Sequence, residues 1–238
     1  MKTPRPIGIL GGMGPEATIL LQSKLVEAVP ARDDNDHIPL LIDMNPQVPS
    51  RIAHLIEGTG IDPGPTLVTM ARLVETVGGV ALAMPCNTAH CYAGAITAAV
   101  DIPLLNMVEL AADHAAEVLG TGGCVGMLAS PAVRRTELFE AALSKRGLSV
   151  IWPTEDEPML AAIRAIKVNG ACSAARDTLR AASRELAAAG AGLQFVACSE
   201  FSIIADSVDA QANAIDTIDL LVRAIIDASQ VNIAERAE

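Results

Sequence analysis

Two cysteines stand at places in the chain where a thiol could do chemistry. Cys86 follows an apolar run over residues 79–84, and Cys198 follows another over residues 194–197. Each is followed by a segment that can begin a helix, whose amides and dipole favour a thiolate. A thiolate and a thiol facing each other across a cleft form a base and an acid that could move a proton between the two faces of a carbon atom. The two stretches indicate a site built from two halves.

Polar side chains follow both cysteines. Asn87 and Thr88 could add hydrogen bonds to a substrate carboxylate held at the helix start. His90 lies one helical turn beyond Cys86, so it either tunes the pKa of that thiol or has a structural role. Glu200 comes two residues after Cys198 and could influence the pKa of its thiol or orient a partner. Cys91 is expected in the core.

Three other segments could bind an anion. Residues 11–15, Gly-Gly-Met-Gly-Pro, either bring backbone amides to a carboxylate or phosphate or form only a tight strand-to-helix turn, and they match no nucleotide-binding pattern. Two prolines stiffen the loop before Arg51, which suits carboxylate recognition or is simply solvated. Lys167 falls in the last turn of a predicted helix, where its default role is to neutralise the helix dipole.

The elements that carry these residues are predicted from apolar runs and helical periodicity. Strands are expected over residues 7–10, 38–44, 79–84, 101–106, 125–128, 149–152 and 194–197. Helices are expected over residues 16–28, 66–76, 109–119, 134–146, 157–169, 176–189 and 213–227, and the tail after residue 231 is expected to fray. Non-alternating strands separated by helices favour a parallel α/β fold, in which ligands bind at the carboxyl ends of strands.

A repeat divides the chain in two. Residues 7–10, Ile-Gly-Ile-Leu, correspond to residues 125–128, Val-Gly-Met-Leu, and Thr18 corresponds to Thr136 at the same offset of 118. The two cysteines are separated by 198 − 86 = 112 residues, nearly the same offset. Matches in register indicate a duplicated α/β unit.

Composition excludes several classes of protein. The formal net charge of −11 argues against nucleic acid or an anionic membrane as a partner, and an acidic substrate would need locally placed cations. We expect a cytoplasmic protein, because no signal peptide or membrane-spanning segment is evident. The five cysteines contain no C-x-x-C pair, so neither a disulfide framework nor a zinc site is indicated, and Cys124 and Cys172 are expected to be buried structural thiols.

Taken together, these motifs resemble the aspartate/glutamate racemase family, whose members work without pyridoxal phosphate. The resemblance covers nearly the whole chain. It rests on residues 11–18 (GGMGPEAT), 45–51 (NPQVPSR), 86–90 (CNTAH), 166–170 (IKVNG) and 198–200 (CSE).

The resemblance implies two pseudo-symmetric α/β domains with the active site between them, commonly in a homodimer. The expected domains are residues 1–103 with 210–238, and residues 104–209. Cys86 and Cys198 would be the two catalytic bases, with no cofactor and no metal, and the substrate a small acidic amino acid. Residues expected to line the substrate site are Met13, Gln47, Arg51, Asn87, Thr88, Ser130, Lys167 and Ser199, with His90 and Glu200 in support. Among them, Arg51 and Lys167 would bind the side-chain carboxylate.

Two departures from the family pattern keep other functions open. The second motif usually reads Gly-Cys-Thr-Glu but here reads Ala-Cys-Ser-Glu, and the usual Gly-Thr pair after residue 128 is replaced in the loop that begins at Ser130. The same fold and cysteines would also suit a maleate isomerase, an arylmalonate decarboxylase or a hydantoin racemase. A third hypothesis is a non-catalytic two-domain binding protein in which both thiols are merely buried.

Overall fold

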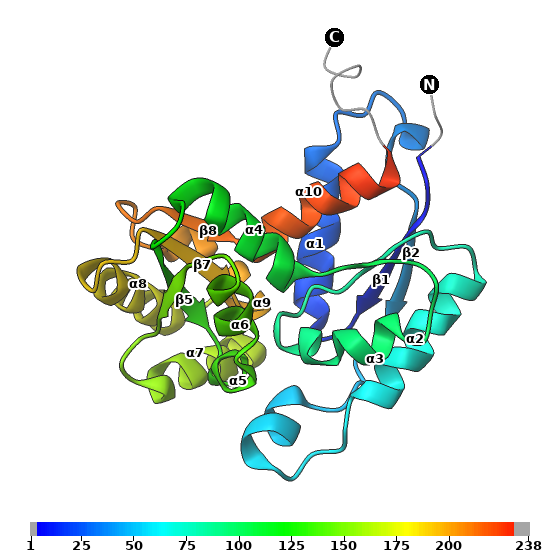
Figure 1. Cartoon of the computed structure of the whole chain (residues 1–238). Coiled ribbons are helices and arrows are strands. Elements are labelled where there is room, and N and C mark those ends of the chain that lie inside the picture. The colour runs from blue at the N-terminus through cyan, green and yellow to red at the C-terminus, as the bar shows by residue number, and fades with distance from the viewer. Residues whose placement is uncertain (1–3, 231–238) are drawn as a thin grey trace.

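Two parallel four-stranded sheets form the framework of the molecule (Figure 1). The computed structural model describes residues 4–230. The first sheet contains β1 (Ile7–Gly11), β2 (Leu40–Met44), β3 (Leu82–Ala83) and β4 (Leu104–Leu105), and the second contains β5 (Cys124–Ala129), β6 (Ser149–Ile151), β7 (Leu193–Ala197) and β8 (Ala214–Asp216). Every strand pair is parallel, so the carboxyl ends of the strands share one edge of each sheet.

The two sheets have the same topology. Their strand orders are β2-β1-β3-β4 and β6-β5-β7-β8, so each strand has a counterpart at the same place in the other sheet. The repeated sequences fall in β1 and β5, the buried inner strands that begin each unit. The duplicated parallel α/β fold expected from the sequence is therefore confirmed.

Helices cover both faces of each sheet. In the first half of the chain they are α1 (Pro15–Ala28), η1 (Asp34–Asp36), η2 (Ala53–Glu57), α2 (Gly64–Thr76), η3 (Thr88–Tyr92), α3 (Ala93–Thr97) and α4 (Met107–Leu119). In the second half they are α5 (Pro131–Thr136), α6 (Leu138–Ser144), α7 (Asp156–Asn169), α8 (Ser173–Ala188), α9 (Ser199–Ser202), η4 (Ala205–Ser207) and α10 (Thr217–Ser229). The predicted helices are thus largely in place, and the expected frayed tail lies outside the described residues.

Helices α4 and α10 cross between the two halves. Helix α4 follows the first sheet but packs Val108 and Ala111 into the core of the second, beside Phe195. Helix α10 follows the second sheet but packs Ile218 and Leu221 into the core of the first. In Figure 1, α10 accordingly lies beside α1 and α4. Each half therefore depends on a helix that the other half supplies.

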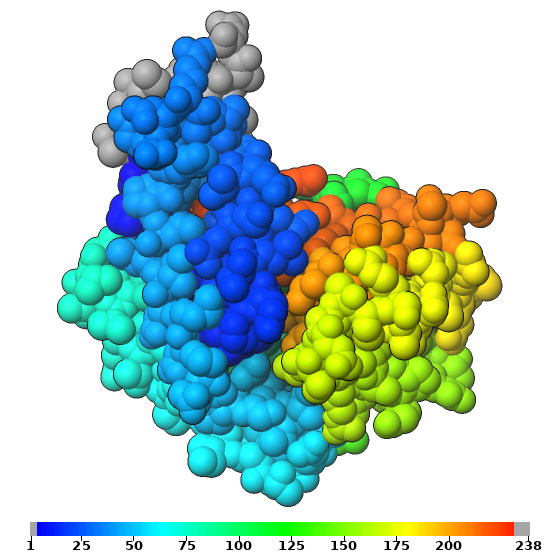
Figure 2. All heavy atoms as spheres, turned by 180° about the vertical axis from the view of Figure 1, so that it is seen from behind, coloured from blue at the N-terminus to red at the C-terminus, as the bar shows by residue number. Residues whose placement is uncertain are grey.

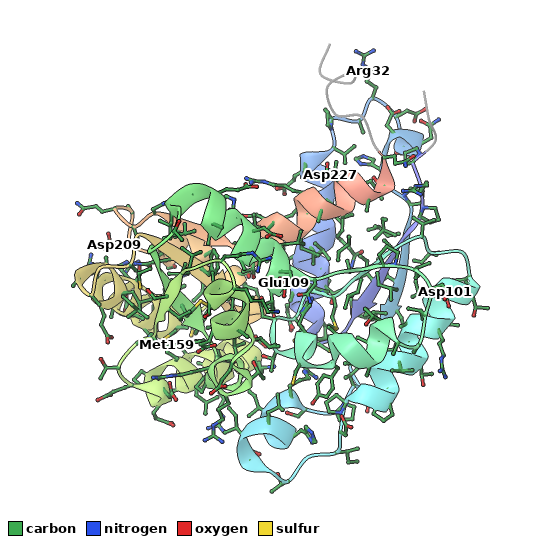
Figure 3. The ribbon with its side chains drawn as sticks, viewed as in Figure 1. Arg32, Asp101, Glu109, Met159, Asp209 and Asp227 are labelled. Atoms are coloured by element: carbon green, nitrogen blue, oxygen red, sulfur yellow. The ribbon has the colours of Figure 1, made fainter. Side chains whose placement is uncertain are left out.

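The middle of the molecule is tied by charges as well as by packing. Glu109 of α4 lies between Asp101 on the first half and Asp209 on the far side of the second (Figure 3). The Glu109 carboxylate pairs with the Arg146 guanidinium of the second half at 2.9 Å, and Asp113 of α4 pairs with the same guanidinium at 2.6 Å. Arg146 follows α6 and donates to the Ala142 carbonyl of that helix at 2.8 Å, so these contacts fix α4 against the end of α6.

Strand pairing shows to which sheet the short segments before α4 and α10 belong. Residues 104–105 form β4 and pair with β3, and residues 214–216 form β8 and pair with β7. The domains expected from the sequence, residues 1–103 with 210–238 and residues 104–209, stay a prediction. Strand β8 lies within the predicted helix over 213–227, which begins only at Thr217 because Asp216 caps it.

Other expectations fail where tertiary packing decides the backbone or the exposure. The helix expected over 134–146 is broken at Glu137, which has φ of +53° and separates α5 from α6. Cys91 is exposed rather than in the core, and Cys124 and Cys172 are only partly buried. In the part of the chain that the structure describes, no helix has both the length and the apolar character needed to span a bilayer.

Candidate active site

One small cavity lies between the two halves and contains both cysteines. Cys86 follows β3 and Cys198 follows β7, which are equivalent strands of the two sheets. The cavity has a volume of about 50 Å³ and is lined by Met13, Ser50, Arg51, Ile52, Cys86, Ser130, Ile163, Lys167, Cys198, Ser199 and Glu200. This is room for one or two water molecules, whose share of liquid volume is roughly 30 Å³ each. An amino acid is larger, so its binding requires these walls to separate.

Most of the predicted site residues meet at this cavity, and four do not line it. Gln47 is exposed, and Thr88 is partly exposed. Asn87 is buried beside Cys86, where its amide nitrogen donates to the Thr217 hydroxyl at 3.0 Å and its oxygen has no partner among the described residues. His90 is buried and bonds the Cys86 carbonyl. Three lining residues, Ser50, Ile52 and Ile163, were not predicted: Ser50 lies in the 45–51 motif but was not singled out within it, and no motif distinguishes Ile52 and Ile163 from core or loop residues.

His90 supports Cys86 through the backbone rather than through the thiol. Its Nε2 accepts a hydrogen bond from the Met107 amide at 3.1 Å, which leaves Nδ1 to donate to the Cys86 carbonyl at 3.0 Å. Burial lowers the pKa of His90 to about 4, so the ring is neutral. The Cys86 carbonyl also accepts from the Ala89 amide at 3.1 Å, and the His90 amide donates to the Asn87 carbonyl at 3.1 Å, so the expected helix begins as the 3₁₀ segment η3.

The Cys198 loop is held in the equivalent way. Ser202 lies four residues after Cys198, as His90 does after Cys86. Its hydroxyl lies 3.3 Å from the Cys198 carbonyl and 2.8 Å from Oδ1 of Asp216, the residue that caps α10. Both thiol loops are thus tied to the start of the helix that crosses to the other half. Sequence reasoning missed Ser202 and Asp216, although their offset from the first half could have identified them.

Asp216 is buried, and only one of its two carboxylate oxygens is hydrogen-bonded within residues 4–230. Oδ1 accepts from the Ile218 amide and from Ser202, whereas Oδ2 has no hydrogen-bond partner among the described residues and lies 4.0 Å from Lys24 Nζ of α1. Burial raises the pKa of Asp216 to about 6. The group therefore titrates just below neutral pH at the junction of the two halves.

Cys198, Glu200 and Lys167 form a hydrogen-bonded chain at the cavity. The Cys198 thiol donates to Oε2 of Glu200 at 3.1 Å, and Oε1 of Glu200 pairs with Lys167 Nζ at 2.8 Å. Burial, followed by the negative charge of Glu200, raises the pKa of Cys198 well above its ordinary value. Burial opposes ionisation of Glu200 and Lys167 as well, but their mutual attraction outweighs it, so the pKa of Glu200 is lowered and that of Lys167 is raised. Cys198 is therefore held as a thiol.

Arg51 reaches the cavity from a segment that bridges the two halves. Its Nη1 donates to the carbonyls of Val48 and Pro49 at 3.3 and 3.0 Å, whereas its Nε is buried with no partner among the described residues. The segment continues into η2, where the Ile56 carbonyl accepts from Arg135 of α5 at 3.0 Å. In Figure 2 this light-blue segment extends below the first half toward the second.

In the glycine-rich turn at residues 11–15, one backbone amide is already hydrogen-bonded to helix α1. The Gly12 amide donates to the Thr18 hydroxyl of α1 at 3.0 Å, so this amide is not free for a ligand. Gly12 has φ of +87°, and a Cβ there would lie 2.3 Å from the Asn45 carbonyl carbon. A side chain is excluded by conformation and by space. The turn at residues 11–15 therefore lies close against the loop that contains Asn45, and Met13 of this turn lines the cavity.

Larger hollows on the second half lack this chemistry. One of about 540 Å³ lies between α7 and α8, and another of about 770 Å³ contains Arg180 and Arg184. Both arginines are paired, with Asp177 and Asp209 respectively, and neither hollow contains a thiol. Volume alone therefore does not identify the site.

These features define a class of protein: two equivalent parallel α/β units with a thiol at the same strand end of each, facing one cavity that also holds an arginine and a lysine. The sequence profile of the Asp/Glu/Hydantoin racemase family matches residues 10–225. The chain belongs to this family, which confirms the resemblance seen in the sequence.

Individual relatives agree with that assignment. The chain is 24% identical over 228 residues to the broad specificity amino-acid racemase RacX of Bacillus subtilis, covering 92% of this chain and 96% of the relative. Its fold is similar to that of Picrophilus torridus aspartate racemase, with a TM-score of 0.85, 24% identity and 98% of each chain covered. A glutamate racemase of Bacillus anthracis superposes with a TM-score of 0.67 at 16% identity, covering 97% of this chain and 84% of that one.

Proposed function

We propose that this protein is a cofactor-independent amino acid racemase that moves a proton between the two faces of Cα by means of Cys86 and Cys198. The observation that carries the proposal is the meeting of these two thiols, from equivalent strands, at one cavity. Buried thiols that only fill space have no reason to occupy equivalent strand ends and to share a cavity with two cations. A racemase also follows from the family to which the chain belongs.

The reaction needs stabilisation of negative charge more than it needs a strong base. The α-proton of an amino acid is a very weak acid, and an unperturbed thiol has a pKa of about 8.5. The carbanion-like transition state must therefore be stabilised by amides and cations in a desolvated site. The two halves must separate to admit the substrate, and closing again around it would provide that environment, because the substrate-free cavity between them is already small.

The preferred substrate on this proposal is aspartate or glutamate. In a protein of net charge −11, Arg51 and Lys167 are the cations that line the cavity, and they would bind the side-chain carboxylate. Asn87, Thr88 and Ser199 would contact the α-carboxylate and amino group, with Ser130 nearby. Of these four, Ser130 and Ser199 already line the cavity.

Isotope exchange combined with two substitutions tests the mechanism. Racemisation in heavy water should place deuterium at Cα, and Cys86→Ser and Cys198→Ser should each abolish turnover. Chiral chromatography with mass spectrometry measures both quantities. Full racemase activity in either variant would refute the two-thiol scheme.

A substrate panel tests the substrate and the alternatives. The relatives include an aspartate racemase and a broad specificity enzyme, so L-aspartate, L-glutamate and neutral L-amino acids are run beside maleate, an arylmalonate and a hydantoin. Turnover of one of the last three without racemisation of any amino acid would support the related isomerase or decarboxylase. Binding of an amino acid without turnover would support a binding protein.

We also propose a homodimer, on the basis of the family resemblance. Light scattering coupled to size-exclusion chromatography measures the molar mass directly. A mass of one 24.7 kDa chain at working concentration would contradict this assembly.

A further inference from the structure

The two thiols differ in charge environment although their burial is the same. Cys86 and Cys198 are each 6% exposed, so access to solvent does not distinguish them. Cys198 donates to the carboxylate of Glu200, whereas the structure gives the Cys86 thiol no hydrogen-bonded carboxylate among the described residues. The duplication makes the difference explicit: the residue two places after Cys198 is Glu200, and the residue two places after Cys86 is the neutral Thr88.

The Glu200 carboxylate is held firmly in this position. The Glu200 side chain projects from α9 toward α7 and is only 13% exposed, with Lys167 Nζ at 2.8 Å on one oxygen, the thiol at 3.1 Å on the other, and the Ser199 hydroxyl at 3.3 Å from that second oxygen. A thiolate at Cys198 would face this carboxylate at hydrogen-bond distance with no proton between them. Lys167 neutralises one negative charge of the pair, but not two.

We propose that Glu200 is the positioning residue that makes the two thiols unequal, holding Cys198 in its protonated form in the substrate-free enzyme so that Cys86 begins the reaction as the base. The proposal deepens the two-thiol function proposed above. In the forward step the Cys86 thiolate takes the proton from Cα, and the S–H bond of Cys198 breaks to deliver its proton to the opposite face of Cα. The products are a Cys86 thiol and a Cys198 thiolate, so total charge is conserved.

The Glu200 carboxylate also forms an ion pair with Lys167. An acidic side chain that binds Lys167 must therefore share or displace Glu200, because the lysine that lines the cavity is already paired with this carboxylate. Removing the charge of Glu200 should tighten the binding of acidic substrates while it impairs proton donation by Cys198. A residue with only a structural role would not lower KM and kcat together.

Alkylation of the substrate-free protein tests the asymmetry without any turnover. Iodoacetamide reacts with the thiolate sulfur, forming an S–C bond as iodide leaves, and peptide mapping by mass spectrometry gives a separate rate for each cysteine. At pH 8 we expect Cys86 to react faster than Cys198, because the hydrogen-bonded carboxylate of Glu200 disfavours the Cys198 thiolate. In Glu200→Gln, which keeps the shape of the side chain, Cys198 should approach the rate of Cys86.

Two further variants complete the experiment. Glu200→Asp retains the charge and should keep Cys198 slow, which separates the role of the carboxylate from that of side-chain volume. Glu57→Gln removes another carboxylate, one on η2 that pairs with Arg164 at 3.4 Å and does not line the cavity, and should leave the ratio of rates unchanged. Equal rates for the two cysteines in the unaltered protein would overturn the proposal, as would a Cys198 rate that Glu200→Gln does not raise.

Kinetics in the two directions provide a second measurement. Enantiomers have equal free energies, so kcat/KM must be the same in both directions. An enzyme that rests in one protonation state binds one enantiomer better, because the apparent dissociation constant rises as the competent fraction falls. We expect unequal KM values, balanced by unequal kcat values, that converge in Glu200→Gln. The alkylation rates are measured without turnover, so they test the effect of Glu200 on Cys198 even if the protein is not a racemase.

Discussion

The buried imidazole of His90 predicts a measurable dependence of stability on pH. Burial lowers its pKa from 6.5 to about 4 in the folded protein. The unfolded chain therefore takes up a proton as the pH falls through 6.5, whereas the folded protein does so only near pH 4, and acidification between these values favours unfolding. Between pH 7.5 and 4.5 this difference amounts to about 2.5 kcal/mol of unfolding free energy.

Substitution of His90 by glutamine removes this titration. At pH 7.5 the variant should be less stable by about 1–3 kcal/mol, because the glutamine amide has a donor and an acceptor but does not place them where the rigid ring holds Nδ1 against the Cys86 carbonyl and Nε2 against the Met107 amide. As the pH is lowered to 4.5, the gap should shrink by about 2.5 kcal/mol, so that the variant becomes nearly as stable as the unaltered protein or more so.

The His90→Gln variant and the parent must be compared at each pH, because the titration of Asp216 changes the free energy of unfolding in the opposite direction. Its pKa is raised to about 6, so the folded protein binds this proton first, and acidification from pH 6 toward 4 stabilises the fold. This contribution cancels in the difference between variant and parent. Urea unfolding followed by far-UV circular dichroism supplies the free energies, and His37→Gln at the partly exposed end of η1 is the control. A gap that stays constant from pH 7.5 to 4.5 would refute the assignment of His90 as a buried neutral ring.

Three other predictions concern the cavity and the crossing between the halves. Lys167→Met should raise KM for an acidic substrate by about 10–100-fold, the value of a hydrogen bond to a charged group, and change KM for a neutral amino acid far less. Gly12→Ala should lower the free energy of unfolding by about 2 kcal/mol or more, because its Cβ meets Asn45 at 2.3 Å and φ is positive; a melting temperature equal to that of the parent would contradict this. Ser202→Ala removes a hydrogen bond from the Asp216 carboxylate, so we expect the loss of stability to be larger at pH 8 than at pH 5.

Much of the fold could be predicted because buried parallel strands are continuous apolar runs. Those runs placed Cys86 and Cys198 at strand ends, and the offset between them identified the duplication. Strand β8 escaped prediction because it has only three residues and ends in a helix cap. The break at Glu137 carries no glycine or proline, so no local signal marks it.

The site was predicted in its residue types more than in its contacts. Spacing alone put His90 on the same side of a helix as the thiol, but the tertiary contact with Met107 turned the imidazole toward the backbone. The hydrogen bonds from Arg51 to the Val48 and Pro49 carbonyls depend on the conformation of a loop without regular periodicity, so the sequence pattern does not predict them. The Lys167–Glu200 pair joins residues 33 positions apart, a distance at which sequence spacing predicts nothing.

The exchange of α4 and α10 has a consequence for synthesis on the ribosome. Strands β1 to β4 are complete once Leu105 has been made, yet the apolar face of the first sheet is covered by α10, which begins more than a hundred residues later at Thr217. At translation rates of roughly 5–20 residues per second, the nascent first half waits on the order of 5–20 s for its last helix. During that interval Ile7 and Ile9 lack the covering of α10, so this is the stage at which the growing chain most needs protection from aggregation.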